Sequence, residues 1–173
     1  NKISRGEKMN VLINEARIEK RVNELAKEIN SDYEGEELVL LGVLKGSVVF
    51  LVDLAKKLKI DVSFEFVDIE FDEENNGKVS KDLKSVIEGK NVLIVEDIID
   101  TGKTITFLKQ HLENLEPKSL EIATLLAKPS RKIEELNVKY IGFGIHDQFV
   151  LGYGMDYKQL YRNLPYVGSI EEF

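Results

Sequence analysis

The sequence predicts a single α/β domain built on a doubly wound, mostly parallel five-stranded sheet flanked by helices. Three observations predict this class: five short apolar segments have the composition of buried strands, helical patterns separate most of them, and turn residues bound them. The length of 173 residues is that of one ordinary domain. We therefore expect ligands to bind where the strands end in loops.

The N-terminal part of the chain predicts a loose segment, a helix and a strand. Residues 1–10 are polar, and residues 11–30 carry apolar side chains at the spacing of one amphipathic helix. These apolar side chains are Ile18, Val22, Leu25, Ala26 and Ile29. Residues 38–44 are a continuous apolar run, hence a buried strand, and Lys45-Gly46-Ser47 follow before a helical pattern over residues 48–58. Backbone amides at such a strand end can face an anion.

The middle of the chain predicts a second strand that runs into a hairpin or mobile lid. Residues 62–69 alternate in polarity and then turn acidic, and Asn75-Asn76-Gly77 is a turn signal. Further along, residues 105–115 predict a helix that Pro117 ends. Two more buried strands are expected at residues 120–127 and 138–145, before a tail dense in aromatic residues and glycine.

Composition excludes several classes of protein. Apolar residues at 43% and charged residues at 32% are typical of a soluble globular protein, and the absence of cysteine argues against a disulfide framework. No apolar run approaches the roughly 20 residues of a membrane span, so we expect a cytoplasmic location and no membrane partner. The net charge of −7 argues against a nucleic-acid surface. The two histidines lack the spacing of metal ligands.

The stretch from residue 92 to residue 106 carries the clearest chemistry. Residues 92–95 form a short buried strand, after which Glu96 and Asp97 place two carboxylates at its carboxyl end. Residues 100–104, with two threonines and a glycine, form a turn into a helix. Backbone amides and hydroxyl groups there converge as a phosphate-binding cup.

This cup is not a P-loop, although Gly102-Lys103-Thr104 matches the end of that motif. The P-loop requires glycine five residues earlier, where Asp97 stands. Two carboxylates beside the cup would repel a bare polyphosphate, so they need a neutral or cationic partner such as ribose hydroxyls or Mg²⁺. Phosphoribosyl pyrophosphate combines a phosphate, a hydroxyl-bearing sugar and a metal-bound diphosphate.

The string from Glu96 to Gly102 closely resembles the phosphoribosyl pyrophosphate signature of the type I phosphoribosyltransferases, in the form found in the bacterial hypoxanthine-guanine branch. The resemblance spans nearly the whole chain. It implies a Mg²⁺-dependent glycosyltransferase of purine salvage. Such an enzyme transfers ribose 5-phosphate from phosphoribosyl pyrophosphate to N9 of hypoxanthine or guanine, giving IMP or GMP and pyrophosphate.

The resemblance also implies a division of the chain and an assembly. A core would span about residues 35–145, a hood would combine the N-terminal segment with residues 146–173, and a flexible lid would cover about residues 69–81. Relatives carry a Ser-Tyr pair on a longer lid, whereas no such pair occurs here. Substrates would be small molecules, and the chain would form a homodimer or homotetramer.

Site residues follow from the resemblance, position by position. Asp100 is the expected catalytic group, as general base or as the acceptor that orients the purine N7–H. A cis peptide is expected between Leu44 and Lys45. The remaining roles are phosphate binding by Asp100, Thr101, Gly102, Lys103 and Thr104; ribose and metal contacts by Glu96 and Asp97, with Asp156 as a further metal ligand; pyrophosphate binding by Lys45, Gly46 and Arg162; and purine binding by Lys128, Phe149, Val150 and Asp156.

Two other functions remain open from the sequence. One is a sister enzyme that prefers xanthine, because Lys128 and Phe149 favour 6-oxopurines without choosing among them. The other is a non-catalytic regulator that senses phosphoribosyl pyrophosphate or nucleotides, which the unusual lid favours. Asp100, Lys128 and the acidic net charge speak against the regulator.

Overall fold

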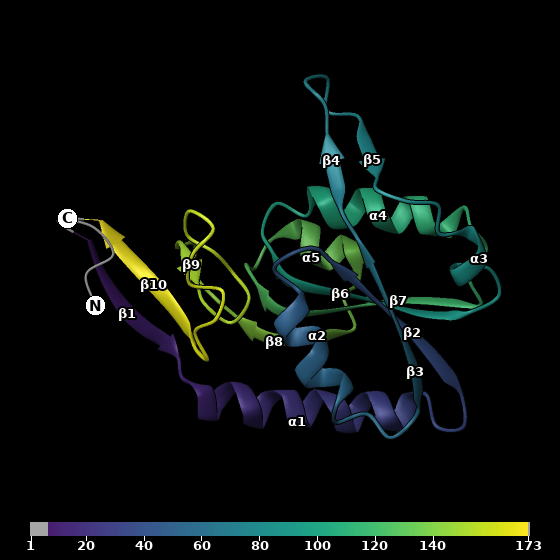
Figure 1. Cartoon of the computed structure of the whole chain (residues 1–173), viewed down its shortest axis with the longest axis horizontal. Helices are drawn as coiled ribbons and strands as arrows, with labels where there is room; N and C mark the ends of the chain where they lie inside the picture. Colours follow the sequence, from purple (N-terminus) through teal and green to yellow (C-terminus); the bar gives the residue numbers. More distant parts are fainter. Residues whose placement is uncertain (1–6, 173) are drawn as a thin grey trace.

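A central five-stranded sheet organises the protein, whose computed structural model describes residues 7–172. All four neighbouring strand pairs are parallel, in the order β3-β2-β6-β7-β8 (Figure 1). The strands are β2 (Glu37–Val43), β3 (Asp61–Val67), β6 (Asn91–Ile99), β7 (Ser119–Ala127) and β8 (Tyr140–Gly144). The predicted fold class is confirmed.

Helices cover both faces of this sheet, which explains why its inner strands are mainly apolar. The long helix α1 (Glu15–Asp32) and α2 (Val48–Ala55) cover one face, where Leu38 and Leu40 point. Val39 and Leu41 point to the other face. That face is covered by α3 (Lys84–Ile87), α4 (Lys103–Glu113) and α5 (Arg131–Leu136). Among the described residues, no helix is long and apolar enough to cross a membrane.

The N-terminal helix begins later than predicted. Asn14 caps α1, because its side-chain oxygen accepts a hydrogen bond from the backbone N–H of Arg17 at 2.9 Å. The five apolar residues predicted to be buried are buried. Residues 11–13, predicted as helix, and residues 7–10, predicted as loose, instead form strand β1 (Glu7–Ile13). The prediction for residues 1–6 falls outside the described part of the chain.

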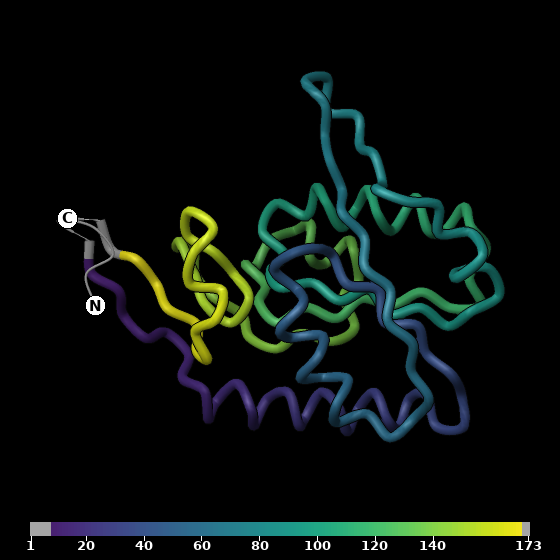
Figure 2. The backbone as a smooth tube through the Cα atoms, in the orientation of Figure 1, coloured from purple at the N-terminus to yellow at the C-terminus, as the bar shows by residue number. Residues whose placement is uncertain are grey.

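The two ends of the described chain pair with each other beside the main sheet. Strand β10 (Val167–Glu172) lies between β1 and β9 (Val150–Leu151), and both pairings are antiparallel (Figure 2). We call the unit formed by β1, β9, β10 and the loops of residues 145–166 the hood. Tyr153 in the hood donates its hydroxyl to Asp53 of α2 at 2.5 Å, which ties the hood to the core.

A hairpin projects from the sheet beside the N-terminus of α4 (Figure 1). Its strands are β4 (Ile69–Phe71) and β5 (Gly77–Val79), which pair antiparallel. The turn between them is held by Asp72, whose carboxylate accepts from the backbone N–H groups of Glu74 and Asn76. Asn75 takes the left-handed conformation, with φ of +64°. The hairpin predicted from the turn signal at residues 75–77 therefore forms.

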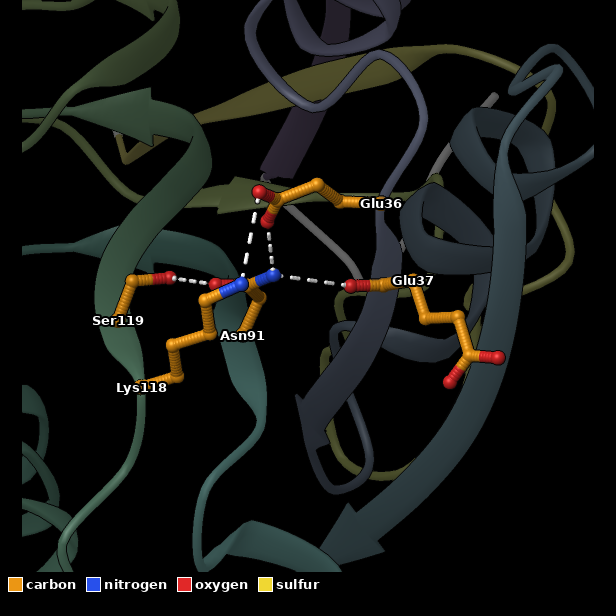
Figure 3. Close-up of polar contacts among 5 residues, drawn as sticks. All are labelled: Glu36, Glu37, Asn91, Lys118 and Ser119. Carbon is orange, nitrogen blue, oxygen red and sulfur yellow. Dashed lines mark hydrogen bonds and ion pairs between the residues drawn. The ribbon is translucent and has the colours of Figure 1, made fainter.

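The amino-terminal edge of the sheet is closed by side chains (Figure 3). Asn91 at the start of β6 donates its amide to the Glu36 carboxylate and accepts from the Ser119 hydroxyl at 2.7 Å. Lys118 forms an ion pair with Glu36 at 3.5 Å. These contacts join the beginnings of β2, β6 and β7. The loops of residues 44–47 and 100–104 lie at the opposite, carboxyl ends of β2 and β6, where open α/β sheets bind ligands.

Candidate functional site

Strand β6 continues through the acidic pair that was expected to follow it. The predicted strand ends at Val95, but the observed ladder with β7 runs on to Ile99. Glu96 is therefore buried within the strand and only 6% exposed, while Asp97 is half-buried. Burial raises the pKa of Glu96 well above its usual value, and the neighbouring charge of Asp97 adds to the effect. Such a carboxyl group keeps its proton to higher pH, and in that form it can donate one hydrogen bond as well as accept others.

The loop predicted to bind phosphate, residues 100–104, connects β6 to α4, and we call it the phosphate loop. Gly102 adopts φ of +79°, a left-handed conformation that glycine takes without strain. The helix begins at Lys103, two residues earlier than predicted, so its first backbone N–H groups belong to the loop. The loop and Glu96 line a hollow of about 120 Å³. This geometry places helix-end donors and hydroxyl groups around one small volume.

A second loop, residues 44–47, approaches the acidic pair from β2. The cis peptide predicted between Leu44 and Lys45 is present. A Cβ atom on Gly46 would overlap the Asp97 carboxylate, and a Cβ atom on Gly154 would overlap the Gly46 carbonyl oxygen. Gly46 and Gly154 therefore allow the loop, the end of β6 and the hood to approach one another more closely than other residues would permit.

The hood completes a larger cavity at this junction. The cavity has a volume of about 340 Å³ and is lined by Lys45, Gly46, Asp97, Ile98, Phe149, Val150, Met155, Asp156 and Arg162. The Phe149 side chain is 52% exposed, so its ring is available for stacking. Arg162 donates to the Gly154 carbonyl oxygen at 2.8 Å and lies 3.5 Å from the Asp156 carboxylate. Apolar, cationic and anionic groups thus share one cavity.

Lys128 links the phosphate loop to the hood. Its ammonium nitrogen lies 3.1 Å from Asp100 Oδ2 and 2.9 Å from Asp147 Oδ1. The hydrogen bond to Asp147 is the main cause that raises the pKa of Lys128, and Asp100 raises it further. The side chain expected to read the purine is therefore a cation in contact with the expected catalytic carboxylate.

The structure separates the expected metal ligands into two hollows. Asp97 and Asp156 line the larger cavity, whereas Glu96 lines the smaller one beside the phosphate loop. Within the described residues, no three Asp, Glu, His or Cys side chains converge to hold a metal ion. Mg²⁺ usually takes one or two carboxylates together with substrate phosphates, and the pair in the larger cavity has that composition.

Three residues of the site were missed by the sequence. Ile98 and Met155 line the larger cavity, and Asp147 pairs with Lys128. A prediction that β6 continues beyond Val95 would have included Ile98 in the strand that reaches the site. The only sequence signal for Asp147 is its position two residues before Phe149, because its pairing with Lys128 arises from the fold.

Comparisons with known proteins agree on one family. The family described as the phosphoribosyl transferase domain matches residues 11–158. A hypoxanthine-guanine phosphoribosyltransferase of Staphylococcus aureus is 44% identical over 166 residues, which cover 93% of each chain. A crystal structure of the enzyme of that name from Bacillus anthracis has 44% sequence identity and a TM-score of 0.88, covering 95% of this chain and 99% of that one. The corresponding L. donovani structure has 33% identity and a TM-score of 0.86, with coverage of 94% and 99%.

Proposed function

The chain belongs to the phosphoribosyltransferase family, and from this premise we propose that it is a purine salvage enzyme. It transfers the ribose 5-phosphate group of phosphoribosyl pyrophosphate to N9 of hypoxanthine or guanine, giving IMP or GMP and pyrophosphate. The observation that carries the proposal is the Lys128–Asp100 contact at 3.1 Å. Asp100 lines the hollow at the phosphate loop, and Lys128 also pairs with Asp147, two residues before Phe149. The Lys128–Asp100 contact places a group suited to a purine oxygen next to a group suited to a purine nitrogen.

Phosphoribosyl pyrophosphate is bound in three parts. Its 5-phosphate occupies the phosphate loop, where Thr101, Gly102, Lys103 and Thr104 supply backbone and side-chain donors. Its ribose hydroxyls form hydrogen bonds with the carboxyl groups of Glu96 and Asp97. Its pyrophosphate lies in the larger cavity, against the backbone N–H groups of Lys45 and Gly46 and the guanidinium group of Arg162.

Mg²⁺ is the cofactor that this site suits. Asp97 and Asp156, which both line the larger cavity, would hold the ion together with oxygen atoms of the substrate. Glu96, also predicted as a ligand, lines the other hollow, where it would contact the ribose. When bound, the ion would neutralise the charge that develops on the leaving pyrophosphate.

The purine is held by stacking and by one hydrogen bond that selects for an acceptor at position 6. The exposed Phe149 ring stacks on the base, and the backbone of Val150 faces the base edge. Lys128 donates to the 6-oxo group. Adenine carries an amino group at that position and cannot accept this hydrogen bond, so the site rejects it.

The reaction breaks the bond between C1 of the ribose and the pyrophosphate oxygen, and forms the bond between C1 and purine N9. As the first bond breaks, the ribose becomes oxocarbenium-like and the leaving group gains negative charge. The amides at Lys45 and Gly46 and the Arg162 guanidinium stabilise that charge. Asp100 accepts the hydrogen bond of the purine N7–H and receives its proton as N9 attacks.

A homodimer or homotetramer is the assembly we propose. Strand β3 is an edge of the main sheet, and its Phe64 side chain is 45% exposed. Leu44, on the loop beside that edge, is 39% exposed. Exposed apolar groups at a strand edge favour burial against another copy. Light scattering across a concentration series measures the assembly, and a monomer at every concentration would contradict it.

Product analysis tests the function. With phosphoribosyl pyrophosphate, Mg²⁺ and hypoxanthine, the protein should form IMP and pyrophosphate in equal amounts, and guanine should give GMP. Formation of XMP alone, from xanthine, would establish the sister activity. Binding of phosphoribosyl pyrophosphate without product from any purine would establish the regulator.

A further inference from the structure

The ammonium group of Lys128 lies between two carboxylates that come from different parts of the chain. Asp100 belongs to the phosphate loop, and Asp147 belongs to the hood loop that leads to Phe149. The Lys128 side chain is 16% exposed, while the Asp147 side chain is 94% exposed. The hood therefore contacts the cationic end of Lys128 through a single, outward-lying carboxylate.

We propose that Asp147 is a positioning residue that orients Lys128 toward the 6-oxo group of the incoming purine. This inference rests on the proposed function and assigns a part of it to a residue outside both cavities. Asp147 lines neither the phosphate hollow nor the larger cavity. It acts through Lys128 and makes no contact with the purine.

The orientation follows from the geometry of an ammonium group. Lys128 has three N–H donors, and rotation about its last side-chain bond sweeps them around one axis. Hydrogen bonds to Asp100 and Asp147 use two donors and fix that rotation, so the third points in one direction. Without Asp147 the group rotates about its remaining bond to Asp100, and the third donor loses its fixed direction.

Asp147 also keeps Lys128 in place while Asp100 accepts the hydrogen bond of the purine. Asp100 must offer an oxygen to the purine N7–H, which weakens its hold on the ammonium group. Asp147 has no such second task and remains bonded to Lys128 throughout. Because Asp147 stands two residues before Phe149, the loop that stacks on the base also fixes the donor that reads the base.

Removing this carboxylate should change purine recognition and leave phosphoribosyl pyrophosphate recognition intact. Asp147→Asn should raise KM for hypoxanthine by about two- to fivefold, the effect of one exposed charge-assisted contact. KM for phosphoribosyl pyrophosphate should stay at its wild-type value, and Asp147→Glu should restore much of the purine KM. Asp61→Asn is the matched control, because it makes the same change at an exposed position at the start of edge strand β3.

A double-mutant cycle separates positioning through Lys128 from any direct role. In a Lys128→Met background, Asp147→Asn should cause no further change in KM for hypoxanthine. An equal loss in both backgrounds, or a matching rise in KM for both substrates, would overturn the proposal.

The ion pair is also measurable without turnover. NMR titration of the Lys128 side chain in the free protein should show a lower pKa in Asp147→Asn than in wild type, and no change in Asp61→Asn. An unchanged pKa would overturn the proposal even in an active enzyme. A lowered pKa in a protein that converts no purine would retain the ion pair and refute the proposed function instead.

Discussion

At the scale of single residues, Asp100 is the group to which we assign proton transfer from the purine. Asp100→Asn keeps the size of the side chain but removes the proton acceptor, so turnover should fall by about 10²- to 10⁴-fold. Phosphoribosyl pyrophosphate binding should survive, because the loop amides and hydroxyls remain. Steady-state kinetics with calorimetry of phosphoribosyl pyrophosphate binding measures both effects. Unchanged turnover would remove Asp100 from the catalytic role.

Glu96 shows the cost of placing an acid inside a strand. Its folded-state pKa is raised, so above pH about 4.3 the unfolded chain loses this proton before the folded chain does. The folded state then binds more protons, and the free energy of unfolding falls as pH rises through the interval between the two pKa values.

Glu96→Gln should therefore stabilise the protein at pH 7 and have little effect below pH 4, because the neutral amide replaces a buried titrating group. Urea unfolding at several pH values measures the difference between variant and wild type. Glu37→Gln, an exposed position at the start of β2, is the control. A pH-independent difference between Glu96→Gln and wild type would contradict the raised pKa.

At the scale of elements, the β4–β5 hairpin is attached to the phosphate loop. Lys103 donates to the Asn75 side chain at 2.7 Å, and its ammonium group lies 4.1 Å from the centre of the Phe71 ring. The Phe71 ring packs edge-on against Phe107 of α4 at 5.7 Å. The hairpin, which is the proposed lid, is thus held by the same lysine that lines the hollow of the phosphate loop.

Phe71→Ala removes both ring contacts and should loosen the hairpin. Amide hydrogen exchange over residues 69–79 should become faster, while exchange in β6 and β7 stays slow. Phe64→Ala on edge strand β3 is the control for loss of an aromatic side chain elsewhere. Unchanged exchange in the hairpin would show that the contacts of the Phe71 ring with Lys103 and Phe107 do not hold it.

The loop of residues 44–47 depends on one close approach. Gly46→Ala should displace either the loop or the Asp97 carboxylate, because the new Cβ atom overlaps that carboxylate. We expect a large rise in KM for phosphoribosyl pyrophosphate. Gly144→Ala is the matched control, since a Cβ atom there meets nothing within 4 Å. Similar kinetics in both variants would contradict the close approach.

At the scale of the whole molecule, the hood and the core both line the larger cavity, so the proposed function depends on how the two are held together. The buried Tyr153 hydroxyl donates to Asp53, and the residue after Tyr153 packs on the Gly46 carbonyl. Tyr153→Phe should lower the free energy of unfolding by about 1.5–3 kcal/mol, as expected for a hydrogen bond to a charged acceptor. Urea unfolding measures it, with Tyr166→Phe in the same tail as control. A loss no larger than that of Tyr166→Phe would contradict the tie.

The sequence predicts features that depend on neighbouring residues and misses those that depend on distant ones. The run in β2 and the turn at residues 75–77 are local signals, and both form. Strand β1 was missed because it exists through pairing with β10, more than 150 residues away. The end of β6 was placed too early because the ladder with β7 outweighs the polarity of Glu96.

The most direct test of the central claim is pyrophosphate release with phosphoribosyl pyrophosphate, Mg²⁺ and each of hypoxanthine, guanine, xanthine and adenine in turn. We predict fast release with hypoxanthine and guanine and no release with adenine, because Lys128 needs an acceptor at position 6 of the purine. Release with adenine at a comparable rate, or no release with any of the four bases despite binding of phosphoribosyl pyrophosphate, would contradict the account.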